Sequence, residues 1–190
     1  ITSSKNLGEG ISIPYFFDLA KNKNFTLTNQ IYGSENPLFY GEYHHALKDS
    51  FLMADFGFTE GYKKTSSTKL AGGKSHFFAQ YVKNFKTNNN ADNNFNLQIQ
   101  DISNDKYLKL YKIKSNLVDY NVDTLESSLN FTRQTEDNFF GLDAVMYERI
   151  KEGSEDKYEY ILPELTFDKN LLNHEKFGSL ELQTNLKIRN

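Results

Sequence analysis

Cysteine and tryptophan are absent from this chain of 190 residues, and proline occurs only three times. Without cysteine the chain can form neither a disulfide framework nor a thiolate metal site. The 22 basic and 25 acidic residues give a net charge of −3, so the sequence lacks the basic excess typical of nucleic-acid-binding proteins. Its apolar runs are short, which excludes a transmembrane helix, since such a helix needs roughly 20 apolar residues.

Aromatic residues, by contrast, are abundant: 16 phenylalanines and 12 tyrosines make up 15% of the chain. They are spread through a polar sequence rather than gathered into apolar blocks. Many aromatic residues in a polar background suit strands that are apolar on one side and polar on the other. The composition therefore favours β-structure.

The clearest pattern lies between Gly8 and Leu47, where three alternating segments are separated by two short turns. Ile11 to Ala20, Phe25 to Ile31 and Phe39 to Leu47 each place apolar or aromatic residues at every second position. Successive side chains of a strand point to opposite faces. The spacing therefore predicts three strands of a sheet with one apolar and one polar face.

Similar segments follow and predict an antiparallel meander of about ten strands joined by hairpins. Many extend over about ten residues, the length at which a tilted strand crosses a bilayer. No segment predicts a helix: Tyr107 to Ile113 alternates like a strand, and we expect a loop from Lys169 to Phe177. The apolar row that we expect to face lipid contains Phe25, Leu27, Phe95, Leu97, Ile99, Leu129, Phe131, Leu182 and Leu186.

Polar residues occupy the face opposite this apolar row. Glu42 and His44 lie in the third predicted strand, Gln98 in the strand around residues 95–100, and Gln183 in the last strand. Carboxylates and amides on this face of a barrel more often line a water-filled interior than carry out chemistry. We therefore predict that these four residues face a lumen.

Residues that often carry catalysis or bind metals lack the spacing that such sites need. His44 and His45 are neighbours in a predicted strand and so point to opposite faces, which disfavours a shared metal ion. Gly72-Gly73-Lys74-Ser75 is similar to the end of a phosphate-binding loop, but the first glycine and the strand-then-helix context are missing. We predict no enzyme activity, no cofactor and no metal site.

Pro14 lies in the middle of a regular alternating segment. Proline has no N–H group to donate to a ladder and is usually confined to sheet edges or bulges. Pro14 therefore indicates either an ordinary edge or bulge, or a strand whose pairing opens easily.

Four segments follow one another in a recognisable order: Gly8 to Tyr32 with Pro14-Tyr15-Phe16-Phe17, Glu42-Tyr43-His44, Ser103 to Leu108, and Tyr158 to Leu165. They resemble the outer-membrane LPS-assembly protein family (LptD, also called organic solvent tolerance protein). That family typically shows PYYW, then E-[YF]-R, S-D-x-x-Y-[LF] and Y-x-x-x-L-P-x-L. Phe17 stands where the family usually has tryptophan, and His44 where it has arginine.

The resemblance implies that residues 1–190 are the first part of a transmembrane outer-membrane β-barrel. The family's N-terminal β-jellyroll and later barrel strands are missing from this sequence. The implied function is delivery of lipopolysaccharide to the outer leaflet of the bacterial outer membrane, without chemical conversion. The implied partners are lipopolysaccharide, a plug lipoprotein similar to LptE, and a periplasmic bridge similar to LptA that contacts the missing N-terminal domain.

The resemblance also implies a lateral gate at the first barrel strand, through which the glycolipid leaves sideways. The corresponding residues here are Ile13, Pro14, Tyr15, Phe16 and Phe17. A proline in this strand agrees with a seam that opens without unfolding of the barrel, because each missing backbone hydrogen bond is worth only about 0.5–1.5 kcal/mol.

Three other classes of protein remain open on the residues alone. The alternation equally fits another outer-membrane barrel, such as a porin or transporter. A soluble β-sandwich or lipocalin-like binding module would need cover for its outward apolar row, and a surface enzyme that acts on glycosides would need catalytic residues. We also expect the chain to be a piece of a longer protein, because it begins at Ile1 with no initiator methionine and no signal peptide.

Overall fold

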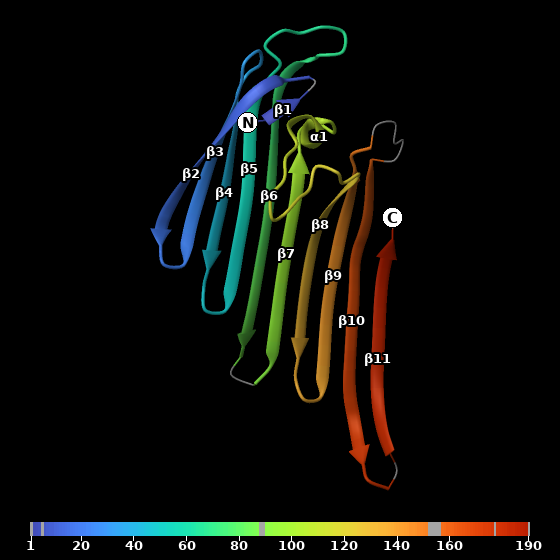
Figure 1. Cartoon of the computed structure of the whole chain (residues 1–190). Helices are drawn as coiled ribbons and strands as arrows, with labels where there is room; N and C mark the ends of the chain where they lie inside the picture. Colours follow the sequence, from blue (N-terminus) through green and yellow to red (C-terminus); the bar gives the residue numbers. More distant parts are fainter. Residues whose placement is uncertain (1, 5, 88–89, 152–156, 177, 190) are drawn as a thin grey trace.

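The computed structural model describes residues 2–4, 6–87, 90–151, 157–176 and 178–189. Within these residues one sheet of 11 strands follows the order of the sequence, and all neighbouring strands are antiparallel (Figure 1). The strands are β1 (Thr2–Ser4), β2 (Gly8–Ala20), β3 (Lys23–Tyr32), β4 (Leu38–Ala46), β5 (Ser50–Gly61), β6 (Ala71–Lys86), β7 (Asp92–Ile102), β8 (Thr124–Gln134), β9 (Asn138–Arg149), β10 (Tyr158–His174) and β11 (Gly178–Arg189). The predicted all-β antiparallel meander is confirmed.

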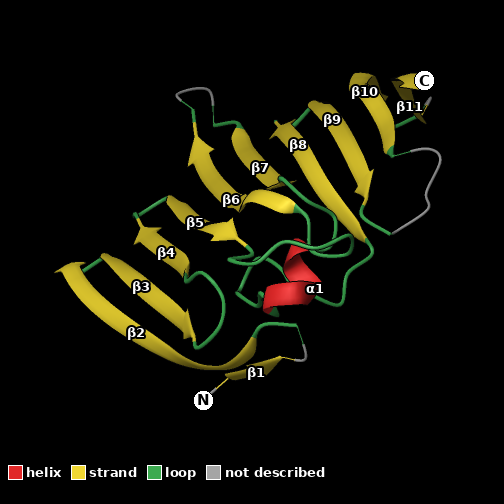
Figure 2. Ribbon diagram, turned by 90° about the horizontal axis from the view of Figure 1, so that it is seen from above, coloured by secondary structure: helices red, strands yellow, loops and turns green. Residues whose placement is uncertain are grey.

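The sheet curves into an open trough (Figure 2). Figure 1 shows the lower hairpins stepping downwards from β2–β3 to β10–β11. Strand tilt and a stagger between neighbours are what a sheet needs to close into a barrel. In the described part of the chain β1 and β11 lie at opposite edges and do not pair, so the trough fits a fragment of a barrel.

The connections at the two ends of the trough differ in length. At one end residues 21–22, 47–49 and 135–137 form short turns between β2 and β3, β4 and β5, and β8 and β9. At the other end residues 62–70 join β5 to β6, and residues 103–123 join β7 to β8. Short turns at one rim and longer loops at the other are typical of outer-membrane barrels.

Residues 103–123, which we call the inserted segment, fold into the concave side of the trough (Figure 2). They contain the only helix in the described part of the chain, α1 (Tyr107–Tyr111). The buried core lies here, between the inserted segment and the long-connection end of the sheet. Its members are Leu7, Tyr32, Leu38, Phe78, Ile102, Tyr107, Leu108, Tyr111, Ile113, Val118, Leu125 and Ile150.

The strand register assigns the two faces. Directly opposite residues on neighbouring strands share a face, and Phe95, Phe131, Leu142, Leu165 and Leu186 form one such row from β7 to β11. The row lies on the convex face, away from the inserted segment. By the same register and the period of two, all nine residues predicted to form one apolar face lie on the convex side.

Two sequence predictions are wrong. Tyr107 to Ile113 is not a strand: its first five residues form α1, which ends where Lys112 takes a left-handed conformation with φ 51°. Lys169 to His174 is not a loop but the end of β10, because β11 provides a partner as far as His174 opposite Gly178. Phe177, the last residue of that predicted loop, lies outside the described residues. No helix in the described residues is long and apolar enough to span a membrane.

Candidate functional site: the β2 edge and the concave face

β2 forms an edge of the trough along most of its length. It pairs with β3 from Gly10 to Ala20, whereas β1 pairs with it only at Gly8 to Gly10. Within the described residues, Ile11 to Ala20 therefore have a strand neighbour on one side only. The Pro14 segment was predicted to be the first strand; β1 precedes it, but the long open edge belongs to β2.

The predicted gate residues lie along this edge. Pro14 is opposite Thr28 of β3, and it has no N–H group for a strand on either side. Tyr15 and Phe16 are neighbours in the strand and so point to opposite faces, and they remain 62% and 61% exposed. Ile13 and Phe17 are also exposed. The edge therefore presents Ile13, Tyr15 and Phe17 on the convex face and a single large apolar side chain, Phe16, on the concave face.

Aromatic rings continue from this edge across the convex face. The Phe25 ring lies 5.8 Å from the Phe17 ring and 6.0 Å from the Phe56 ring, between ring centroids. Gly41 lies on β4, between β3 and β5, and leaves room for these rings. A Cβ atom at this position would lie 2.6 Å from Phe56 Cζ. β2 is thus joined to the sheet by ring packing as well as by its ladder with β3.

The four predicted lumen residues all lie on the concave face. His44 and Gln98 belong to one row, His44–Met53–Gln80–Gln98, and Glu42 lies in the next row opposite Asp55. Gln98 donates a hydrogen bond through Nε2 to the Glu126 carbonyl oxygen at 3.2 Å. Gln183 lies in the middle of β11, opposite Asp168; it is on the same face but far from the other three residues. The structure therefore places three of the four on two neighbouring rows of the concave face, between β4 and β7.

The inserted segment covers the next part of this concave face, and the sequence reasoning missed it. Tyr107 of α1 and His76 of β6 are both buried, and the Tyr107 hydroxyl lies 3.0 Å from His76 Nδ1. Burial raises the pKa of the Tyr107 hydroxyl, so this group stays protonated. The missed signal was the spacing of Tyr107, Leu108 and Tyr111, which places three apolar residues on one side of a helix.

Gly57 of β5 has no side chain, and this leaves room for α1 to lie close to the sheet. A Cβ atom at this position would lie 2.5 Å from His76 Cε1 and 2.8 Å from the Tyr107 hydroxyl oxygen. A second bond anchors the far part of the segment, where Gln100 donates through Nε2 to the Leu117 carbonyl oxygen at 3.0 Å. The inserted segment is therefore seated against the wall at two separate points.

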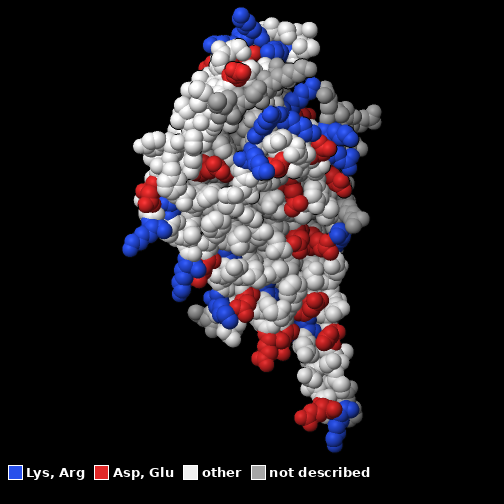
Figure 3. Space-filling model, in the orientation of Figure 1, with Lys and Arg blue, Asp and Glu red and all other residues white. Residues whose placement is uncertain are grey.

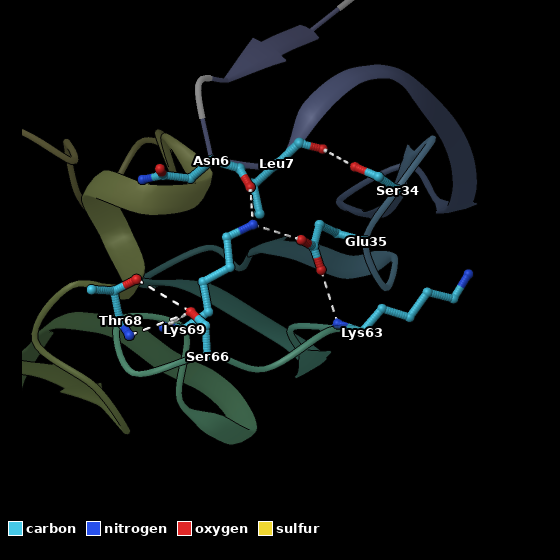
Figure 4. A network of polar contacts seen from close by, with 8 residues as sticks. All are labelled: Asn6, Leu7, Ser34, Glu35, Lys63, Ser66, Thr68 and Lys69. Atoms are coloured by element: carbon cyan, nitrogen blue, oxygen red, sulfur yellow. Dashed lines mark hydrogen bonds and ion pairs between the residues drawn. The ribbon is translucent and has the colours of Figure 1, made fainter.

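A polar network at the long-connection end ties three loops together (Figure 4). The buried Glu35 carboxylate accepts hydrogen bonds from Lys69 Nζ at 2.9 Å and from the Lys63 backbone N–H at 2.8 Å. Lys69 Nζ also donates to the Asn6 carbonyl oxygen at 3.0 Å. Burial raises the pKa of Glu35, but these bonds and the charges of both lysines outweigh it and lower the pKa below its ordinary value.

A second ion-pair group joins the inserted segment to the start of β10. Lys157 Nζ lies 3.1 Å from Asp105 Oδ1 and 3.1 Å from Oε1 of the buried Glu148. Hydrogen bonds to these two carboxylates raise the pKa of Lys157. No pattern in the sequence marks Glu35 or Lys157, because their partners come from distant loops.

The described residues contain no group of three or more His, Cys, Asp or Glu side chains that could hold a metal ion. The structure instead provides two unlike surfaces that meet at one edge of the sheet. An apolar convex face and a polar concave face meet along the exposed edge of β2. Such an edge can guide a molecule with one polar and one apolar part, which needs contact with both faces at once.

No protein-family model matches the chain. The sequence is 29% identical over 116 residues to the LPS-assembly protein LptD of Psychrobacter cryohalolentis, which covers 50% of this chain and 12% of the relative. The chain thus matches about one eighth of the length of that protein. This similarity supports a relationship between the chain and LptD, and it agrees with the sheet, which fits a β-barrel fragment.

Proposed function

We propose that this chain is part of an outer-membrane β-barrel that delivers lipopolysaccharide to the outer leaflet of the bacterial outer membrane. The delivery is transport, without chemical conversion of the glycolipid. The observation that carries the proposal is the exposed β2 edge, where an apolar convex face meets a polar concave face. The similarity to LptD supports it.

The convex row faces the lipid chains, and the concave face lines the lumen with Glu42, His44 and Gln98. Lipopolysaccharide has a polar saccharide part and apolar acyl chains, so it needs a path that is polar on one side and apolar on the other. The β2 edge provides such a path where the barrel opens sideways. Ile13, Pro14, Tyr15, Phe16 and Phe17 form the gate strand of this proposal.

Residues 1–190 then form the first barrel strands of a longer protein, and the other parts of that protein provide the remaining contacts. A lipoprotein similar to LptE occupies the lumen, against the concave face. A periplasmic bridge similar to LptA supplies the lipopolysaccharide through an N-terminal domain outside this sequence. The short-turn end faces the periplasm and the long-connection end faces the exterior, as is usual for such barrels.

The test compares Pro14→Ala with Pro163→Ala in the full-length protein, in cells with matched barrel levels. Alanine at position 14 restores an N–H donor and removes the restriction on the backbone of Ile13. We expect a tighter seam and slower appearance of lipopolysaccharide at the cell surface, with folding unchanged or improved. Pro163 lies at an irregularity of β10 between Ile161 and Glu164, far from β2, and its replacement should affect stability more than delivery.

Two outcomes would contradict the gate. One is delivery at the unaltered rate by the Pro14→Ala protein. The other is a loss of barrel abundance in Pro14→Ala equal to that in Pro163→Ala, which would make Pro14 a structural residue only. If depletion of the whole protein left surface lipopolysaccharide unchanged, the proposed function itself would be wrong.

A further inference from the structure

Lys74 of β6 is a buried lysine without an acidic partner among the described residues. Its exposure is 7%, and its Nζ atom contacts the Gly72 carbonyl oxygen at a long 3.4 Å and lies 5.0 Å from the centre of the Tyr62 ring. Lysine is almost never buried unless it is paired, because an unpaired buried charge is strongly disfavoured. The positive charge of Lys74 is therefore left for something else to neutralise.

A second lysine, Lys69, lies beside the same Tyr62 ring, and its own positive charge is balanced by Glu35. Lys69 Nζ lies 5.0 Å from the centre of the Tyr62 ring and pairs with Glu35 at 2.9 Å. Of the two ammonium groups beside the Tyr62 ring, only that of Lys69 is thus paired with a carboxylate. A hollow of about 500 Å³ opens beside them, and Tyr62, Thr68 and Lys74 are among its lining residues. This volume is within the usual range for small-molecule sites.

Two glycines, Gly61 and Gly72, shape the backbone around the Lys74 ammonium. Gly61 has φ +84°, and a Cβ atom on it would lie 2.3 Å from the Gly72 carbonyl oxygen and 3.2 Å from Lys74 Nζ. Gly72 has φ +120° and lines the hollow, with no atom within 4 Å of its ideal Cβ position. Gly61 therefore lets the Gly72 carbonyl oxygen lie close to it, and Gly72 leaves open space at the hollow, where a ligand can approach the backbone.

The surroundings add positive charge at the same end of the molecule. An adjoining hollow of about 710 Å³ shares Tyr62, Asp105 and Lys106, among others, with the first. The two linings together contain five lysines and two aspartates; Asp123 pairs with Lys109, and Asp105 pairs with Lys157. In Figure 3 Lys and Arg side chains gather at the upper, long-connection end of the molecule. The field at the hollow therefore favours an anion that arrives from this rim.

We propose that Lys74, with Lys69 and Tyr62, forms a binding site for a phosphate monoester group at the long-connection end of the trough. Lysine binds phosphate as a point charge. Leu70, Leu110 and the Tyr62 ring, which line the same hollow, give the sugar or lipid part that carries the phosphate an apolar surface. The site goes beyond the proposed delivery of lipopolysaccharide and does not require it.

The test measures binding to the full-length protein in zwitterionic detergent, with inorganic phosphate and glucosamine 1-phosphate as soluble probes. Nanodiscs with phosphatidic acid, compared with phosphatidylcholine alone, test a lipid source of the same group. Lys74→Met should weaken phosphate binding at least about tenfold, since it removes the unpaired charge. Lys48→Met, an exposed lysine in the short turn between β4 and β5, is the control and should bind as the unaltered protein does.

Thr68→Asp keeps the test decisive if Lys74→Met does not fold. Thr68 is exposed and lines both hollows, so an aspartate there adds a negative charge without disturbing the core. It should also weaken phosphate binding at least about tenfold. Binding of the lipid probe alone would identify the lipid as the source and support the site. The proposal is overturned if no probe binds, or if the folded variants bind as tightly as the control.

Discussion

Replacement of Gly57 by alanine tests whether the inserted segment is held in the trough by close packing. The new methyl group would lie 2.5 Å from His76 Cε1 and 2.8 Å from the Tyr107 hydroxyl oxygen, so one of these side chains must move. Overpacking of this kind costs about 1–3 kcal/mol, and loss of the His76–Tyr107 hydrogen bond about 0.5–1.5 kcal/mol. We expect the docking of residues 103–123 to weaken by about 2–4 kcal/mol.

Amide hydrogen exchange of the full-length protein in detergent measures this effect directly. A loss of about 2–4 kcal/mol corresponds to exchange that is roughly 30-fold to 1000-fold faster, where exchange occurs through undocking. The amide hydrogens of Leu110 and Ile113 are suitable reporters, because both are bonded to carbonyl oxygens within the segment. The strands β5 and β6 should keep their protection, because their ladder is not altered.

Gly41→Ala is the matched control. Its methyl group would lie 2.6 Å from Phe56 Cζ, a similar crowding, but on the convex face. Exchange in the inserted segment should therefore stay unchanged. Tyr107→Phe removes the hydroxyl that the new methyl group would meet, so the double variant should lose less than the sum of the single variants. Unchanged exchange in Gly57→Ala, or equal effects of Gly57→Ala and Gly41→Ala, would refute the packing argument.

Two further predictions concern the faces and the loops. Leu97→Arg should lower the free energy of unfolding in lipid by about 2–4 kcal/mol, while Gln98→Arg should be mild; equal tolerance in a urea titration would mean that the faces are assigned wrongly. Glu35→Gln should cost about 1–2 kcal/mol at neutral pH. Because the folded pKa of Glu35 is lowered, its contribution is present above the ordinary value of 4.5 and lost as pH falls through the folded pKa. The two proteins should therefore converge in stability in acid, and a constant difference at all pH values would contradict the ion pair.

The sequence was sufficient to predict the sheet because alternation is a local signal. Phe95, Leu97 and Ile99 alternate with polar residues without interruption, and each lies opposite a residue of the same face on β6. The period of two decides which residues share a face before any partner strand is known. The same reasoning placed Glu42, His44 and Gln98 on the concave side, opposite the apolar row.

The inserted segment was mispredicted because its structure depends on distant contacts. A helix of five residues is not stable by itself in water, so local propensity gives it no signal. Tyr107 and Leu108 of α1 are buried against the sheet, whose residues in this cluster, such as Phe78 of β6, are distant from α1 in the sequence. The partners of Glu35, which are Lys69 and the Lys63 backbone N–H, also come from a loop that lies close to Glu35 only in the fold.

The distribution of apolar residues argues against the soluble alternatives. A lipocalin-like module or a sandwich buries apolar side chains between its walls and turns polar ones outwards. Here the middle of the concave face carries polar pairs, such as Asn130 Nδ2 with Asp143 Oδ1 at 2.5 Å. The convex face leaves Phe56 46% exposed and Leu186 52% exposed. Among the described residues the core cluster lies under the inserted segment, so the exposed apolar row on the convex face agrees with the lipid-facing surface of the proposed barrel.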